Sequence, residues 1–315
     1  MNIGICCKAS HVFGMGHLYR MLTLAQMLRD QGANVIFVVN ADAAVAKVLT
    51  GYNAPFIQQD FSAATGWEAQ IIGEHKITIW INDRLQTQRE HAQCVTGSGV
   101  KLVTFDDVGD GAVLADLNIV ALPALYEQYP LQGKAIRQGV SWLILPPVLE
   151  HLRRHRSQMA ARAVCLGGSD TYGVTVRVAE MLRQQGIDAT YFVGPAFRHG
   201  EALAKIVPSG HIRQAVPSLL EELARFDLAI TGGGMIAFES AAMGLPTIVI
   251  ANEKHEEFNA RMLERLGCSF YAGYHEVLES EALWRIVDIA AMSRAGLDTV
   301  ATDGGRRVVA EIEQL

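Results

Sequence analysis

The clearest chemical signal is a short glycine turn near the N-terminus. Gly14 and Gly16 precede His17, and the apolar residues that follow recur at helical spacing. Glycines let backbone approach a ligand, helix N-termini attract anions, and histidine exchanges a proton near neutral pH. This predicts a ligand-binding turn with His17 as a proton acceptor, against the simpler alternative of a plain turn. Tyr19 stands where a dinucleotide fingerprint needs glycine, which disfavours such a site.

Two further glycine turns follow apolar runs in the second half of the chain. Gly167 and Gly168 precede Ser169, which with the next residue either caps a helix or contacts a phosphate or ribose. The stretch Gly232–Gly234 leaves the following helix N-terminus open, as a pyrophosphate requires. Glu239, about one turn into that helix, either accepts hydrogen bonds from two ribose hydroxyls or is solvated.

A charged segment follows the apolar run that ends at Ala251. It contains His255, Glu256 and Asn259, and taken alone it reads as a solvated helix start. Ligands of open α/β sheets collect at the carboxyl ends of strands, which is where this segment falls. We therefore also consider these three residues as ligand contacts.

Metal and nucleophile motifs are weak in this sequence. It contains no H-E-x-x-H, D-x-D or G-x-S-x-G pattern. The pair Asp106 and Asp107 could bind Mg²⁺, but paired acids after a strand more often cap a loop. We expect neither a metal nor a cofactor.

Apolar runs alternating with helical patterns position these residues, and such alternation predicts parallel βα units. The sequence thus predicts an α/β protein with a domain at 1–147, a linker near 146–157 and a second domain at 148–315. A last helix at 304–315 can fold back onto the first domain. The predicted strands are Ile3–Cys7, Val35–Val39, Ile77–Ile81, Leu102–Phe105, Leu117–Leu122, Trp142–Leu145, Ala163–Leu166, Thr190–Val193, His211–Val216, Leu228–Thr231 and Thr247–Ala251.

Composition narrows the class of protein. The 315 residues suit about two domains, and the net charge of -6 argues against nonspecific nucleic-acid binding. Five cysteines without C-x-x-C spacing favour a reducing cytoplasm. No apolar stretch reaches the ~18 residues of a spanning helix, which leaves peripheral membrane contact open.

Three blocks together resemble one enzyme family. They are residues 14–25 (GMGHLYRMLTLA), 166–170 (LGGSD) and 227–234 (DLAITGGG). These blocks are similar to the GT-B-type UDP-sugar hydrolases of pseudaminic acid biosynthesis, over nearly the whole chain in order. The last block, continued to residue 260, also resembles the peptidoglycan N-acetylglucosaminyltransferase and other GT-B enzymes.

This resemblance implies two Rossmann-like domains facing across a cleft, with sugar chemistry in the first and uridine diphosphate in the second. It implies that His17 is catalytic. Asp83 matches the first residue of an Asp-His-Tyr pattern of the family, whereas Arg84 and Leu85 differ from the next two. In the charged segment after Ala251, His255 and Glu256 stand where the family usually has Asn-Gln.

We therefore expect a hydrolase that releases UDP from a UDP-linked amino or deoxyamino sugar, with His17 as general base. The alternatives are a glycosyltransferase that uses a UDP-sugar donor and a non-catalytic nucleotide-sugar binding protein. A nucleotide-sugar epimerase is a more distant alternative. The predicted catalytic residues are His17 and Asp83. The predicted substrate contacts are Gly14, Gly16, Arg20, Gly167, Gly168, Ser169, Gly232, Gly233, Gly234, Met235, Glu239, His255, Glu256 and Asn259.

Overall fold

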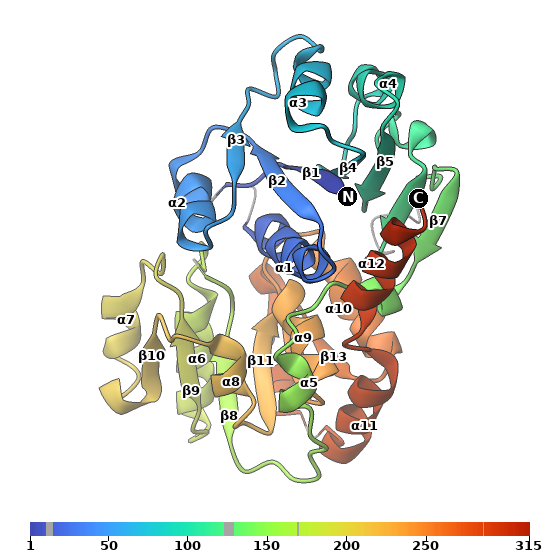
Figure 1. The fold of residues 1–315 in the computed structure, drawn as a ribbon. Coiled ribbons are helices and arrows are strands. Elements are labelled where there is room, and N and C mark those ends of the chain that lie inside the picture. Colours follow the sequence, from blue (N-terminus) through green and yellow to red (C-terminus); the bar gives the residue numbers. More distant parts are fainter. Residues whose placement is uncertain (11–14, 123–128, 169, 286) are drawn as a thin grey trace. The chain divides into compact units, whose positions relative to one another are not determined.

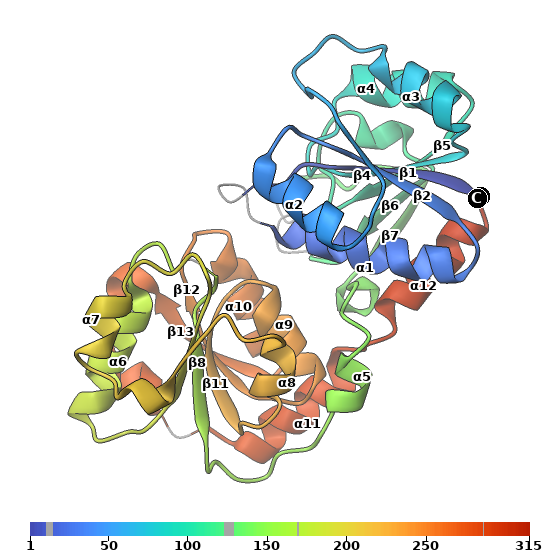
Figure 2. The same ribbon diagram turned by 60° about the vertical axis from the view of Figure 1, so that its left-hand side comes forward.

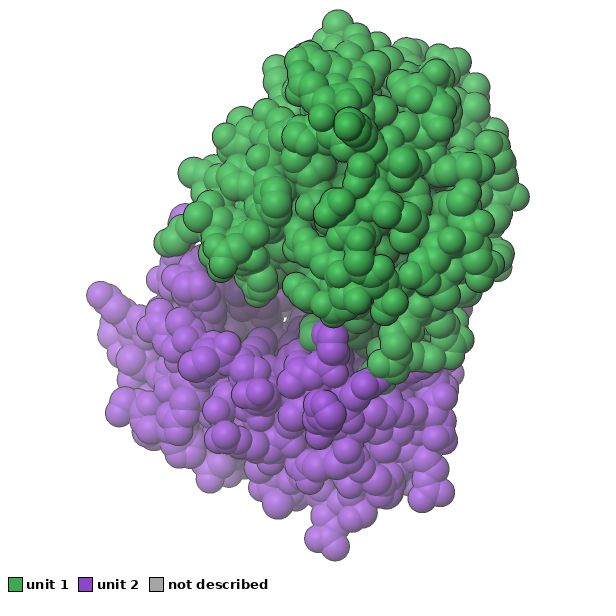
Figure 3. All heavy atoms as spheres, viewed as in Figure 1, with its two compact units in different colours: residues 1–146, 302–315 green, residues 147–301 purple. Residues whose placement is uncertain are grey.

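The computed structural model describes residues 1–10, 15–122, 129–168, 170–285 and 287–315. The chain divides into two compact units, coloured separately in Figure 3. Unit 1 comprises Met1–Pro146 and Thr302–Leu315, and unit 2 comprises Pro147–Ala301. Each contains one parallel sheet covered by helices, so the predicted pair of doubly wound α/β domains is confirmed.

The described part of unit 1 has a seven-stranded parallel sheet in the order β3-β2-β1-β4-β5-β6-β7 (Figure 1). Its central strands carry buried apolar side chains on both faces, as a sheet covered on both sides requires. The strands are β1 (Asn2–Cys7), β2 (Asn34–Val39), β3 (Phe56–Gln58), β4 (Ile79–Asp83), β5 (Lys101–Phe105), β6 (Leu117–Val120) and β7 (Ala135–Gln138).

Helices cover both faces of this sheet (Figure 2). The apolar stripe of α1 packs with α2 and α12 on one face, and α3 and α4 cover the other. Asp42 begins α2 by accepting hydrogen bonds from the N–H groups of Ala44 and Val45. The helices are α1 (Gly16–Asp30), α2 (Ala43–Gly51), α3 (Trp67–His75), α4 (Arg89–Gly97) and α12 (Gly304–Glu313), with short 3₁₀ turns at Ala112–Leu114 and Val140–Trp142.

The described part of unit 2 has a six-stranded parallel sheet in the order β10-β9-β8-β11-β12-β13. Helix α6 packs on one face, while α9 connects β11 to β12 and packs against α11. The strands are β8 (Arg162–Cys165), β9 (Thr190–Val193), β10 (Ile212–Gln214), β11 (Leu228–Gly232), β12 (Thr247–Ala251) and β13 (Ser269–Tyr274). The helices are α5 (Leu149–Leu152), α6 (Val174–Gln184), α7 (Gly200–Ala204), α8 (Leu219–Leu223), α9 (Met235–Ala242), α10 (Glu256–Arg265) and α11 (Ile289–Thr299).

Several strands differ from the prediction. The fourth strand runs two residues later than the predicted Ile77–Ile81 and ends at Asp83. The predicted strand Trp142–Leu145 is wrong, because its buried leucines follow a 3₁₀ turn and the sheet edge is formed by β7. Strands β3 and β7 are short and only partly buried, and β13 contains a bulge and a glycine, so their apolar patterns are weak.

The predicted linker is ordered against unit 2 through its arginines. Arg153 donates to the carbonyl oxygen of Ala242 at the end of α9 (2.8 Å). Arg156 is fully buried and donates to the carbonyl oxygens of Phe226 and Met243, both at 2.7 Å. These side chains satisfy carbonyl groups that helix ends leave unpaired. Within the described ranges, no helix is long and apolar enough to cross a membrane.

Candidate active site

Each sheet has one position where the connections reverse direction. In unit 1 it lies between β1 and β4, and in unit 2 between β8 and β11. Open α/β sheets bind ligands at the carboxyl ends of strands at such switch points. The predicted site residues follow the carboxyl ends of these strands or, in the second unit, of the neighbouring β12.

In unit 1 the structure brings His17 and Asp83 together. His17 lies in the first turn of α1, and its Nδ1 is 2.8 Å from Oδ1 of Asp83 at the end of β4. The carboxylate is fully buried, whereas 26% of the imidazole is exposed. The pair therefore has a buried anion at its inner end and an accessible ring at its outer end.

Arg20 lies one turn further along α1 and faces the same carboxylate. Its Nε and NH2 donate to the two oxygens of Asp83 at 2.7 and 2.6 Å, and its NH1 donates to Asp106. The side chain is only 10% exposed. Arg20 was predicted as a substrate contact, but its guanidinium is directed inward at the two acids.

This environment fixes the charge of Asp83. Burial alone would raise the pKa of the carboxyl, but the positive charge of Arg20 and the hydrogen bonds from Arg20 and His17 lower the pKa to about 2. The ionised carboxylate only accepts hydrogen bonds, so the Nδ1 of His17 carries the proton. With Nδ1–H directed at the carboxylate, Nε2 is the ring nitrogen that can accept a proton from a substrate, as in Asp–His pairs of hydrolytic enzymes.

Arg84 and Leu85, two of the positions that differ from the pattern expected from the resemblance, lie in the loop after β4. Arg84 stacks over the ring of Phe61 at 4.5 Å, and Leu85 has a positive φ of 65°. The carbonyl oxygen of Leu85 accepts from the N–H of Val108, and Gly109 packs closely on the backbone of Thr87. The loop is therefore held by its backbone rather than by the Leu85 side chain.

The acidic pair after β5 has two separate roles. Asp107 accepts hydrogen bonds from the N–H groups of Thr87 and Gly109, at 3.0 and 2.8 Å, and thereby caps the loop. Asp106 instead binds Arg20, together with the N–H groups of Ala121 and Leu122. Sequence reasoning recognised the capping but missed the ion pair, because the residues are 86 positions apart.

The glycine turn before α1 lies partly outside the described residues, which exclude Gly14. Gly16 begins the helix, and open space surrounds the position of a Cβ there. Met15, which precedes the helix, provides no side-chain hydrogen bond to the first N–H groups. The N-terminus of α1 therefore keeps the anion-attracting character that the sequence predicted.

Unit 2 contains a cavity of about 360 Å³ at its own switch point. Gly167, Gly168 and Glu239 line it, together with residues that the sequence did not predict. Among these are Phe192, Ala215, Leu219 and Ile236. The apolar surroundings, with one carboxyl and several backbone groups, suit a small ligand with a flat apolar part and a few hydroxyls.

Glu239 is the titratable group of this cavity. It projects from α9, is half-buried, and its carboxyl has no hydrogen-bond partner in the described part of the chain. Burial raises the pKa of this group to about 7. An unpaired carboxyl with a raised pKa in a cavity is typical of a ligand site.

The glycine turn before α9 is held by two residues of α10. Oε2 of Glu256 accepts from the N–H of Gly233 (3.3 Å), and Nδ2 of Asn259 donates to the carbonyl oxygen of the same residue (3.0 Å). A Cβ on Gly233 would lie 2.7 Å from Glu256. Glu256 and Asn259 therefore hold the backbone of this turn by hydrogen bonds, whereas the sequence predicted that they contact the ligand.

The remaining predicted contacts of unit 2 lie around this turn. Gly232 ends β11, and Gly234 precedes α9, which begins at Met235, without a side-chain hydrogen bond to the first N–H groups of the helix. His255 is exposed. Ser169 lies outside the described residues.

The segment after β8 also has a capping role. Asp170 accepts from the N–H groups of Val174 and Thr175 at the start of α6 (2.9 and 2.7 Å). This agrees with the capping alternative for this block, while Gly167 and Gly168 line the cavity.

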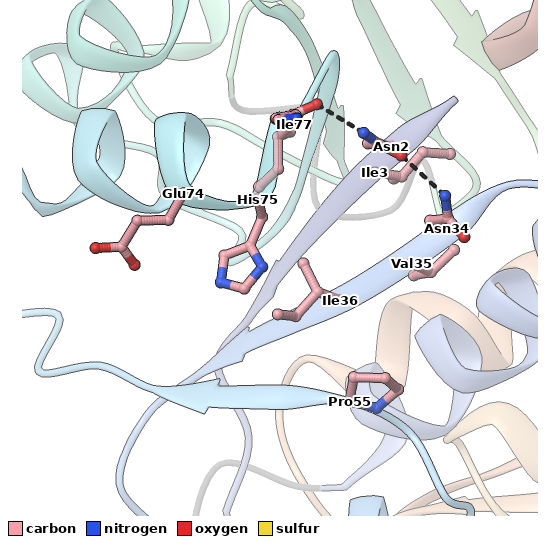
Figure 4. Close-up of a pocket in the computed structure, with 10 residues that line it drawn as sticks. Asn2, Ile3, Asn34, Val35, Ile36, Pro55, Glu74, His75 and Ile77 are labelled. Carbon is pink, nitrogen blue, oxygen red and sulfur yellow. Dashed lines mark hydrogen bonds between the residues drawn. The ribbon is translucent and has the colours of Figure 1, made fainter.

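A larger groove of about 480 Å³ lies at the opposite edge of the first sheet (Figure 4). It follows the amino ends of β1 and β2, where Nδ2 of Asn34 donates to Oδ1 of Asn2 at 3.0 Å. Nδ2 of Asn2 in turn donates to the carbonyl oxygen of Lys76. The side-chain amides of Asn2 and Asn34 are therefore already hydrogen-bonded. Ligands of open α/β sheets bind at the carboxyl ends of the strands, and this groove lies at the amino ends.

Comparisons with known proteins agree with this architecture. No protein-family model matches the chain. The spore coat polysaccharide biosynthesis protein SpsG of Bacillus subtilis (strain 168) is 23% identical over 300 residues, 90% of this chain and 87% of SpsG.

Solved structures give the same picture of the fold. Acinetobacter baumannii MurG matches with a TM-score of 0.76 at 14% identity over 100% of both chains. The spinosyn rhamnosyltransferase SpnG matches with a TM-score of 0.67 at 16% identity over 99% of this chain and 100% of its own. The chain therefore has the GT-B fold of these proteins.

Proposed function

We propose that this protein is a glycosyltransferase that uses a nucleotide sugar, with His17 as the general base. The observation that carries the proposal is the hydrogen bond between His17 and the ionised, buried Asp83. Support also comes from the similarity to a polysaccharide biosynthesis protein and to the fold of a rhamnosyltransferase. One fold supports several reactions, so the assignment rests on the site.

In this proposal unit 1 supplies the base. Asp83 holds Nδ1–H of His17, and Nε2 takes the proton of an acceptor hydroxyl as its oxygen bonds to the anomeric carbon. The bond between that carbon and the phosphate oxygen breaks, and its electrons leave with the nucleoside diphosphate. General-base catalysis of this kind contributes about 10²–10⁴-fold to a rate.

Unit 2 holds the nucleotide in the same proposal. The cavity walls around Phe192 and Ile236 take the base, and Glu239 accepts hydrogen bonds from the ribose hydroxyls. The N-terminus of α9 faces the diphosphate and stabilises its negative charge as it departs. The predicted nucleotide is UDP.

Hydrolysis is a second candidate, in which the same base activates water. It is favoured by the block 14–17 (GMGH) followed by the block 167–170 (GGSD), which together resemble the hydrolase family, whereas the third block resembles GT-B enzymes more widely. Release of UDP without an acceptor separates the two reactions, because only water attack needs no second substrate.

The test measures UDP release from a panel of UDP-N-acetylated and diacetamido-trideoxy sugars, with and without sugar acceptors. His17→Ala is compared with wild type, and His75→Ala, an exposed histidine outside the site, is the control. We expect acceptor-dependent release that falls by about 10²–10⁴-fold in His17→Ala while UDP affinity is retained. Equal loss of turnover and UDP binding would exclude His17 as the base. UDP binding without release in any arm would instead indicate a binding protein.

A further inference from the structure

Asp106 is placed to act on the candidate base through Arg20. Its backbone has a positive φ of 48°, a conformation that Asp and Asn tolerate better than most residues. Oδ1 accepts from the N–H groups of Ala121 and Leu122 at 2.9 and 3.3 Å, which leaves Oδ2 directed at Arg20. The carboxylate is thus anchored to backbone on one side and to the guanidinium on the other.

The charges around His17 do not balance. Among the residues that the structure describes, Asp83 and Asp106 form ion pairs with one guanidinium, that of Arg20, and all three side chains are at most 10% exposed. Cys7 on β1 also belongs to this cluster, and its thiol is uncharged because burial raises its pKa well above the usual range. With neutral imidazole the cluster carries one excess negative charge, which a protonated His17 would neutralise.

We propose that Asp106 is a positioning residue for His17, which fixes Arg20 against Asp83 and supplies the excess negative charge that favours proton uptake by the imidazole. The proposal deepens the proposed function, since it concerns the residue assigned there as the base. A buried charge acts strongly because it is poorly screened by solvent. Loss of that charge should therefore weaken the affinity of the imidazole for a proton.

Asp106→Asn tests this with little change of shape. The amide oxygen still accepts the two backbone N–H bonds, and Asn tolerates the left-handed backbone. Asp106→Gly also suits a positive φ and provides a second variant if the first does not fold. Asp116→Asn is the matched control, since Asp116 also accepts a backbone N–H, from Leu102, but lies at the opposite edge of the sheet.

The measurement is the pH titration of the His17 ring protons by NMR, assigned by the loss of their signal in His17→Gln. We expect the midpoint of Asp106→Asn to lie about 0.5–1 pH unit below that of wild type, and that of Asp116→Asn to be unchanged. The acid limb of kcat/KM for UDP release should move by the same amount, since the base then loses its proton at lower pH.

An unchanged His17 midpoint in folded Asp106→Asn and Asp106→Gly would overturn the proposal and leave Asp106 as a loop anchor. The NMR titration needs no substrate. A shifted His17 midpoint in Asp106→Asn without turnover in the wild type would thus support the positioning role and contradict the proposed function. Turnover in the wild type with an unshifted midpoint in Asp106→Asn would support the proposed function and contradict the positioning role.

Discussion

Asp83, at the end of β4, and Glu239, in α9, respond differently to burial. Asp83 is fully buried, yet the charge of Arg20 and the hydrogen bonds around it lower its pKa to about 2. Glu239 has no hydrogen-bond partner among the described residues, and burial raises its pKa to about 7. The first is thus set as a permanent anion that orients an imidazole, and the second changes charge near physiological pH. Partners, rather than depth, decide which role a carboxyl takes.

Glu239→Gln should stabilise the free protein at high pH. The pKa of Glu239 is about 7 in the folded state and near 4.5 in the unfolded state, so the folded state binds more protons between those values. Stability contributed by Glu239 is therefore full below pH 4.5 and falls as the pH rises to 7. We expect the variant to gain about 1–2 kcal/mol over wild type at pH 8 and little at pH 4.5.

Urea unfolding at both pH values measures this difference, with Glu313→Gln, an exposed helix residue, as the control. A gain that is the same at pH 4.5 and pH 8 would mean that Glu239 titrates as in the unfolded chain.

At the level of elements, close backbone contacts shape the cavity of unit 2. The loops after β8 and β9 meet at Gly168 and Gly194, where a Cβ on Gly194 would lie 2.2 Å from the carbonyl oxygen of Gly168. Around Gly168 itself there is open space. Both glycines line the cavity, but only Gly194 is required by the close approach of the two loops.

The variants Gly194→Ala and Gly168→Ala should therefore separate folding from binding. Gly194→Ala must displace backbone and should cost about 2 kcal/mol of stability. Gly168→Ala should leave stability unchanged and weaken UDP binding about tenfold, because the new methyl group enters the cavity. Thermal melts and UDP titration calorimetry measure the two effects. Unchanged UDP affinity in Gly168→Ala would place the nucleotide elsewhere.

At the level of the whole molecule, unit 1 is assembled from both ends of the chain. Helix α12 packs on α1, with Val308, Val309 and Ile312 in the same apolar cluster as Leu24. A Cβ on Gly305 of α12 would lie 2.6 Å from Sδ of Met27 on α1, so the two helices approach closely there. Unit 1 therefore depends on residues that follow all of unit 2 in the sequence.

Ile312→Ala should loosen unit 1 selectively. The side chain is fully buried, and its truncation should cost about 2–4 kcal/mol. In hydrogen exchange measured by mass spectrometry, we expect faster exchange in α1 and β1 and little change in α6 and β8. Ala310→Gly, on the exposed side of α12, is a control for loss of helix propensity. Equal acceleration in both units would mean that they unfold together.

The sequence by itself determined what depends on local pattern. Apolar runs and helical spacing predicted most strands, because each buried strand or helix face needs its own periodicity. The glycine turns were located for a similar reason, since a turn between strand and helix is encoded by adjacent residues. Short edge strands such as β7 escaped because little of their surface is buried.

Only the tertiary structure decided which side chains meet. The pairing of His17 with Asp83 spans 66 residues and that of Arg20 with Asp106 spans 86, and no local pattern encodes either distance. The inward roles of Arg20 and Glu256 followed for the same reason. Hydrogen bonds and ion pairs are effective over a few ångströms, so they are set by how strands are ordered in a sheet rather than by separation along the chain.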